Sequence, residues 1–180
     1  ARQFQALGHV PVVLAPQASR LALWGSQSPY EVVRHPRFFS TRYFVAWYRR
    51  FLRQEFERKP FDVLHCHGIY PPSYLAALVR SEIPVPVVVT SHGEWLHAGA
   101  DGESDPVIAE RCLAGLRAAD ALVAISRTAR ESYLRQCPDA APRIVDIPPG
   151  VNLANLAAPA TRPPGLPERL TPDGYAVFVG

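Results

Sequence analysis

Apolar runs alternate with helical patterns along most of the chain. Short, nearly continuous apolar runs, typical of buried strands, occupy residues 9–15, 61–68, 85–93, 119–126, 143–150 and 174–180. Apolar residues at helical spacing occupy residues 1–7, 41–59, 71–80, 106–118 and a segment that follows Ser126. Residues 16–40 and 97–105 are rich in turn-forming or polar residues and predict loops. Continuous apolar strands separated by helices predict an α/β fold with a doubly wound parallel sheet.

Small polar residues and prolines mark several of the expected boundaries. Gly8 fits the end of the first helix, whereas Asp105 and Ser126 are good N-terminal caps for later helices. Residues 151–172 hold five prolines and little periodicity, which predicts a linker. The chain is therefore expected to comprise a sheet domain over residues 1–150, a linker over 151–173 and a strand over 174–180 that begins another domain.

The segment 41–59 predicts an amphipathic helix with aromatic and basic sides. One side carries Phe44, Trp47, Tyr48, Phe51, Glu55 and Phe56, and the other carries Arg42, Arg49, Arg53 and Glu57. Two interpretations follow: the helix packs on the sheet, or its basic, aromatic surface touches a membrane or an acceptor.

Charge is unevenly distributed along the 180 residues. Residues 1–60 hold ten Lys and Arg against three acids, a net charge of +7, and residues 61–180 hold nine against thirteen, a net charge of −4. The basic part could attract phosphates, anionic lipid or nucleic acid, or its arginines could simply line solvated helix faces. No apolar run approaches the ~20 residues of a membrane span. Three cysteines at unrelated spacings favour reduced thiols in a cytosolic setting.

Polar or small residues gather where the predicted strands end. They are His65, His67, Gly68, Ser91, His92, Gly93, Ser126 and Gly150. In doubly wound sheets, ligands bind beyond the carboxyl ends of the strands. The pattern therefore predicts a ligand cleft along this edge, with His92 on its rim.

Several chemistries fit these residues poorly. His65-Cys66-His67 suggests zinc, but strand alternation places Cys66 on the opposite face from the histidines, and Asp62 is out of phase with them. A cysteine within an apolar strand is more often a small hydrophobe than a nucleophile. The chain has no nucleophile elbow, P-loop or glycine-rich dinucleotide fingerprint, and no nucleic-acid recognition motif. Glycines, helix N-termini and a neutral imidazole suit a sugar phosphate or a sugar nucleotide.

The sequence resembles a known enzyme family in the order and spacing of several segments. These are FDVLHCHG, PVVVTSHGEW, ADALVAISRTARE and IVDIPPGVN, followed by a linker and YAVFVG. They resemble the N-terminal, subfamily 4-like domain of retaining glycosyltransferases with the GT-B fold, in family 4, or glycosyl transferases group 1. ARQFQALGHVPVVLAP is similar to the end of the family's first helix and its second strand. The resemblance covers nearly all of the chain except residues 16–60.

The resemblance implies a Rossmann-like, acceptor-side domain of an enzyme that moves a sugar from a nucleotide donor to an acceptor. His92 corresponds to the family histidine that reaches the donor sugar, and it is the expected catalytic residue. The expected substrate-binding residues are His67, Gly68, Gly93, Ser126, Arg127, Gly150 and Asn152. No metal or other cofactor is expected, since the nucleotide sugar is a substrate. The setting implied is cytoplasmic, at the inner face of a membrane contacted through residues 41–59.

The chain also departs from the family pattern. The family's first strand and glycine-rich loop would precede Ala1, and its donor-binding residues would follow Gly180, so we expect this chain alone to be inactive. The strand at 174–180 would begin the donor-binding domain; in the isolated chain it would cover the gap in the sheet, or the chain would pair with another copy. Two alternatives stay open: a sugar-nucleotide epimerase, for which Glu94 is the nearby candidate base, and a non-catalytic carbohydrate-binding or scaffold domain.

Overall fold

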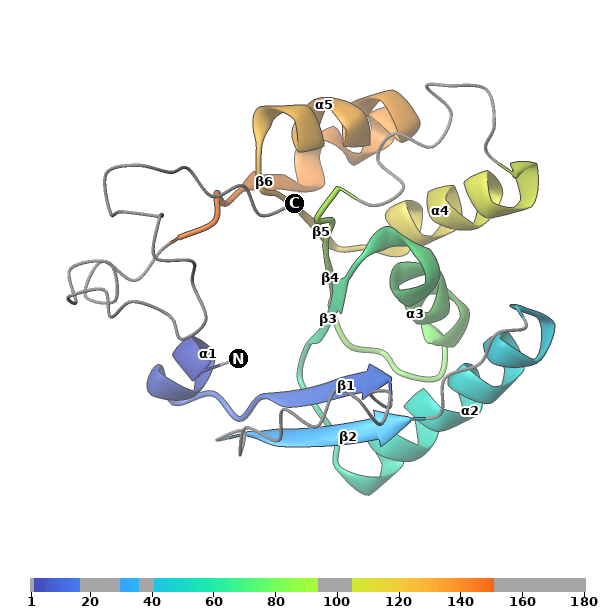
Figure 1. Cartoon of the computed structure of the whole chain (residues 1–180), viewed down its shortest axis with the longest axis vertical. Helices are drawn as coiled ribbons and strands as arrows, with labels where there is room; N and C mark the ends of the chain where they lie inside the picture. Colours follow the sequence, from blue (N-terminus) through green and yellow to red (C-terminus); the bar gives the residue numbers. More distant parts are fainter. Residues whose placement is uncertain (1, 17–29, 36–40, 94–104, 151–180) are drawn as a thin grey trace, which may run out of the picture. The chain divides into compact units, whose positions relative to one another are not determined.

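The computed structural model describes residues 2–16, 30–35, 41–93 and 105–150 (Figure 1). The helices are α1 (Arg2–Ala6), α2 (Thr41–Arg58), η1 (Ile69–Ser73), α3 (Tyr74–Val79), α4 (Pro106–Ala118), α5 (Arg127–Gln136) and η2 (Pro138–Arg143). The strands are β1 (Val12–Pro16), β2 (Glu31–His35), β3 (Leu64–His67), β4 (Val87–Thr90), β5 (Ala121–Ala124) and β6 (Ile144–Asp146). The chain divides into two compact units, Ala1–Ile147 and Pro148–Gly180. The predicted linker from residue 151 and the strand at 174–180 lie outside the described residues.

The strands form two parallel sheets, one of β1 and β2 and one in the order β3-β4-β5-β6. The predicted α/β class with parallel strands is confirmed, and each predicted strand that falls on described residues is present in a shorter form. The prediction of a loop over residues 16–40 is wrong at Glu31–His35, which form β2. This segment is short and lies among turn-forming residues, so its pairing with β1, rather than its own pattern, makes it a strand.

One face of the four-stranded sheet forms the main core. The register aligns Cys66 with Val89, Val89 with Leu122, and Leu122 with Ile144, so these side chains share one face. All four are buried. Helices α3, α4 and α5 contribute to the same cluster through Ala76, Cys112, Leu116, Ala129 and Tyr133. Hydrophobic burial on this face is the main force that holds the sheet to its helices.

A second core lies between α2, α3 and β1. It includes Leu52, Leu75, Val79, Ile83 and Val85, with Leu14 of β1 packed against it. The aromatic side of α2 faces inward, since Trp47, Tyr48 and Phe51 surround the buried His35 of β2 at ring-centroid distances of 6.1, 4.5 and 5.8 Å. This packing supports the first of the two interpretations of the amphipathic helix. A membrane contact of α2 stays a prediction.

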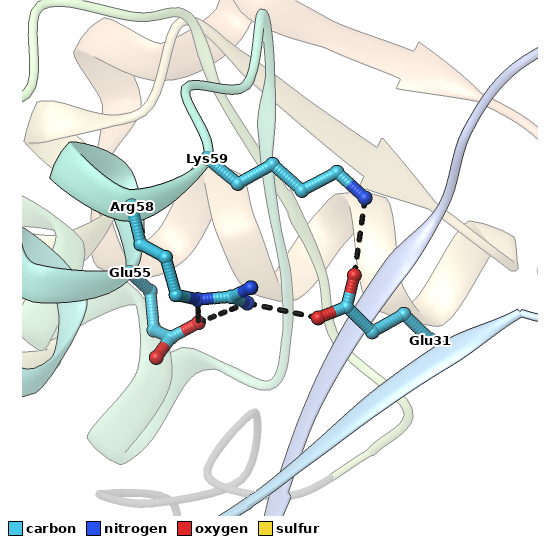
Figure 2. A network of polar contacts seen from close by, with 4 residues as sticks. All are labelled: Glu31, Glu55, Arg58 and Lys59. Atoms are coloured by element: carbon cyan, nitrogen blue, oxygen red, sulfur yellow. Dashed lines mark hydrogen bonds and ion pairs between the residues drawn. The ribbon is translucent and has the colours of Figure 1, made fainter.

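The C-terminal end of α2 is tied to β2 by an exposed network of charges (Figure 2). Arg58 contacts Glu55 at 2.7 Å and Glu31 at 2.8 Å, and Lys59 contacts Glu31 at 3.0 Å. The hydrogen bonds from Lys59 and then Arg58 lower the pKa of Glu31. Because the groups are exposed, solvent screens the network, and it fixes the orientation of the helix end more than it stabilises the fold. Glu82 likewise pairs with Arg49 and Arg53 on the basic side of α2.

The predicted end of the first helix and the predicted starts of two later helices are confirmed. Asp105 Oδ1 accepts a hydrogen bond from the Val107 amide at 2.9 Å, and Ser126 Oγ accepts one from the Ala129 amide at 3.1 Å. Gly8, with φ of 85°, follows the last turn of α1. The predicted helix over 71–80 differs in its start, because η1 precedes α3 and Ser73 donates to the Ile69 carbonyl.

A close approach of α4 to η1 depends on a glycine. A Cβ atom at Gly115 would lie 2.9 Å from the backbone carbon of Ser73. Only a residue without a side chain allows this packing distance. Among the residues that the structure describes, no helix is both long enough and apolar enough to cross a bilayer.

Candidate functional site

The carboxyl ends of β3 and β4 place a set of polar side chains on the face opposite the main core. His67 of β3 is aligned with Thr90 of β4, and His65 with Val88. Alternation along β3 therefore sends His65 and His67 to one face and Cys66 into the core, as the sequence predicts. His92 follows two residues after the end of β4, beside the predicted cleft edge.

The three imidazoles of His65, His67 and His92 form a continuous row. The His65 and His67 rings stack at 4.4 Å with an interplanar angle of 29°, and the His67 and His92 rings lie side by side, 5.4 Å apart, with an interplanar angle of 9°. A hydrogen bond joins His67 Nδ1 to His92 Nε2 at 3.1 Å. One ring nitrogen of this bond must donate and the other accept, so the bond requires that at least one imidazole be neutral. The two exposed members, His67 and His92, thus act as a pair.

The inner histidine of the row is held by a buried hydroxyl. His65 Nε2 shares a hydrogen bond of 2.8 Å with Thr90 Oγ1, and Thr90 is 5% exposed. Burial, followed by repulsion from His67 and His92, lowers the pKa of His65. His65 therefore stays neutral over a wider pH range than an exposed histidine, which limits the charge that the three histidines accumulate.

Two glycines with positive φ flank the histidine pair. Gly68 has φ of 121° and donates its N–H to the Thr90 carbonyl at 2.8 Å, which joins the ends of β3 and β4. Gly93 has φ of 113° and donates its N–H to Ser91 Oγ at 3.3 Å. The added Cβ of a larger residue at Gly93 would meet no atom within 4 Å, so the backbone angle, not space, favours glycine there.

Tyr133 contacts the backbone beside His92, and the sequence did not predict this contact. Its hydroxyl accepts a hydrogen bond from the Ser91 amide at 2.9 Å and donates to the Val123 carbonyl at 3.3 Å. The side chain comes from α5 and is fully buried. A signal was available: a tyrosine on the buried side of a predicted helix, four residues after Ala129, needs a partner for its hydroxyl.

The thiol of Cys66 does not belong to the histidine cluster. It is buried in the core and contacts the Pro72 carbonyl at 3.6 Å, and burial raises its pKa to about 12. Such a thiol is neutral at physiological pH and unreactive, which removes the nucleophile alternative. Within the described ranges, no group of three or more His, Cys, Asp or Glu side chains is placed to hold a metal ion.

The other predicted site residues have different placements. Ser126 caps α5, and Arg127 is exposed and pairs with Glu131 at 2.8 Å. Gly150 is exposed and belongs to the unit Pro148–Gly180. Asn152 and Glu94 lie outside the described residues. The structure therefore brings together six residues of the predicted cleft edge and adds Thr90 and Tyr133 to them. The six are His65, His67, Gly68, Ser91, His92 and Gly93.

Comparison with known proteins identifies the family. No curated protein matches this chain in sequence. The model of Glycosyltransferase Family 4 matches residues 1–155, which include all of the described strands and the row of three histidines. This agrees with the Rossmann-like domain indicated by the sequence and with the parallel sheets of the structure. The chain therefore belongs to Glycosyltransferase Family 4, as a glycosyltransferase-type domain.

Proposed function

We propose that this chain is the acceptor-side domain of a retaining glycosyltransferase. The enzyme would move a sugar from a nucleotide-sugar donor to a glycan, a lipid or a small-molecule acceptor. Membership of the family supports glycosyl transfer in general. The observation that carries the proposal further is the hydrogen-bonded pair of His67 and His92 at the carboxyl ends of adjacent parallel strands. A glycine of positive φ follows each of the two histidines.

The chemistry of this pair suits a sugar. A neutral imidazole donates through one nitrogen and accepts through the other, so it matches hydroxyl groups that also do both. The hydrogen bond to His67 Nδ1 restricts the plane of the His92 ring, which lies within 9° of the plane of the His67 ring. A ring held in advance loses less conformational entropy when it binds. In the proposed role, His92 orients the donor sugar at the reacting carbon.

Gly93 would serve the approach of the ligand. It is exposed, so the backbone there carries no side chain between the sheet edge and a bound molecule, whereas Gly68 is buried and joins the ends of β3 and β4. In the transfer, the bond between the anomeric carbon and the donor diphosphate breaks, and the nucleoside diphosphate leaves with the bonding electron pair. A bond to the acceptor oxygen forms, and the acceptor hydroxyl passes its proton to the departing diphosphate. His67 and His92 would hold the sugar in place during this exchange.

The test is an assay of sugar transfer by the protein from the complete reading frame that encodes these residues. UDP-glucose and GDP-mannose serve as donor probes, and the anomer of the product is read by NMR. We expect the anomer to be that of the donor, and His92→Ala to lower kcat/KM on the order of 100-fold. His9→Ala is the matched control, because His9 is an exposed histidine in the segment that leads into β1.

Two outcomes would contradict the proposal. Inversion of the anomer would exclude a retaining enzyme, and full activity of His92→Ala would exclude the role given to this histidine. The purified 180-residue chain provides a further check. We expect it to show no transfer and to bind the two nucleotide sugars with a Kd above about 1 mM, so transfer by this chain alone would overturn the acceptor-side assignment.

A further inference from the structure

The hydroxyl group of Tyr133 joins the ends of two neighbouring strands. Thr90 of β4 and Val123 of β5 form the last aligned pair of these two strands. The Ser91 amide comes directly after this pair, where β4 ends. The Ser91 N–H donates to Tyr133 Oη at 2.9 Å, and Tyr133 O–H donates to the Val123 carbonyl at 3.3 Å. One side chain from α5 therefore fixes the point at which β4 ends.

This fixed point lies immediately before His92. Ser91 is fully buried, and its Oγ accepts a hydrogen bond from the Gly93 amide at 3.3 Å. The backbone is thus held on both sides of His92. The Ser91 amide before it donates to Tyr133 Oη, and the Gly93 amide after it donates to Ser91 Oγ. The ring of His92 is held separately by His67 Nδ1. The imidazole can meet His67 in this geometry only if its backbone leaves β4 in the observed direction.

The hydroxyl, not the ring, supplies this contact. The Tyr133 side chain is 0% exposed and belongs to the main core, where a phenylalanine would pack equally well. A buried hydroxyl must be hydrogen-bonded to be tolerated, and this one is bonded to backbone groups at the ends of both strands. The Tyr133 hydroxyl oxygen therefore holds the backbone in place at the end of β4.

We propose that Tyr133 is a positioning residue for His92, acting through the Ser91 amide. This inference rests on the proposed function, in which His92 orients the donor sugar, but its structural part does not depend on any substrate. Tyr133 touches neither sugar nor acceptor in this scheme. Its hydroxyl sets the backbone from which the His92 ring reaches His67.

The test is Tyr133→Phe in the 180-residue chain, observed by NMR without ligand. Amide hydrogen exchange reports the holding of Ser91 and Gly93, and the imidazole ¹⁵N resonances of His92 report its tautomer and its bond to His67. We expect exchange at Ser91 to accelerate about five- to tenfold and the His92 resonances to move. A role in packing alone would leave the His92 resonances in place.

Tyr70→Phe is the matched control. Tyr70 lies in the same core, and its hydroxyl accepts a hydrogen bond from the Arg111 side chain at 3.1 Å. We expect this variant to leave the Ser91 exchange rate and the His92 resonances unchanged. The proposal is overturned if Tyr133→Phe leaves His92 unchanged, or if Tyr70→Phe moves it to the same extent.

A second variant keeps the test valid if Tyr133→Phe fails to fold. Ser91→Ala removes the acceptor of the Gly93 amide and leaves the Tyr133 hydroxyl in place. We expect it to accelerate exchange at Gly93 and to move the His92 resonances while the Ser91 amide stays protected. Unchanged His92 resonances in Ser91→Ala would contradict positioning through this backbone. Because no substrate is present, either result is independent of whether the protein transfers sugar.

Discussion

The two faces of the four-stranded sheet carry opposite kinds of residue on the same strands. In β3, Cys66 points into a core formed by Val89, Leu122 and Ile144, whereas His65 and His67 point to the other face. All four of these side chains on the core face are buried. The histidine face is polar at its carboxyl end and half-buried or exposed elsewhere, with Val145 48% exposed.

The contrast shows how one short strand serves two purposes. Alternation divides Leu64-His-Cys-His67 into a half that contributes apolar burial and a half that contributes hydrogen-bonding groups. Substitutions on the core face should therefore change the free energy of unfolding and spare the chemistry of the histidines. Substitutions on the histidine face should change pH dependence and hydrogen bonding with smaller effects on stability.

The largest effect is expected on the core face. Leu122→Ala removes a fully buried side chain from the centre of the main core. We expect the free energy of unfolding, measured by urea denaturation, to fall by about 3 kcal/mol. Val145→Ala, on the opposite face of the next strand, is the control and should cost less than about 1 kcal/mol. Equal losses in the two variants would show that both faces are equally packed.

A smaller loss is expected in the layer that covers the core face. Gly115→Ala would force a Cβ atom against the backbone and side chain of Ser73. We expect a loss of about 2 kcal/mol by the same measurement, because α4 and η1 must separate. Gly150→Ala is the matched control, since a Cβ atom there meets nothing within 4 Å. A stabilised Gly115→Ala variant would mean that the two helices have room to move apart.

The smallest effect is expected on the histidine face, and it depends on pH. The pKa of His65 is lowered by burial and then by repulsion from its neighbours. In the unfolded chain this group takes up a proton near pH 6.5. The unfolded state therefore binds more protons just below that pH, and the free energy of unfolding falls as pH drops from about 7.5 to about 5.5.

His65→Gln should weaken this dependence. The glutamine amide can replace His65 Nε2 as the partner of Thr90, but it does not titrate. We expect the urea midpoint of the variant to change less between pH 7.5 and 5.5 than that of the unsubstituted chain. His9→Gln, which replaces an exposed histidine, controls for the loss of a titrating group. An identical pH dependence of His65→Gln and the unsubstituted chain would contradict the neutral state assigned to His65.

Much of the fold followed from local pattern. Continuous apolar runs gave β3, β4, β5 and β6, and the caps at Asp105 and Ser126 gave the starts of α4 and α5. Strand β2 was missed because five residues among turn formers carry too little signal of their own, and the parallel pairing with β1 determines their conformation. The packing of the α2 aromatics around His35 depended on that same strand.

The sequence by itself determined the α/β class, the positions of His67 and His92 at strand ends and the separation of Cys66 from them, because side-chain alternation and the ends of apolar runs are local properties. Only the tertiary structure decided that His67 and His92 share a hydrogen bond, that Thr90 holds His65, and that Tyr133 joins β4 to β5. These contacts link residues 10 to 42 positions apart. Strand register and helix packing set such contacts, and no pattern within one segment specifies them.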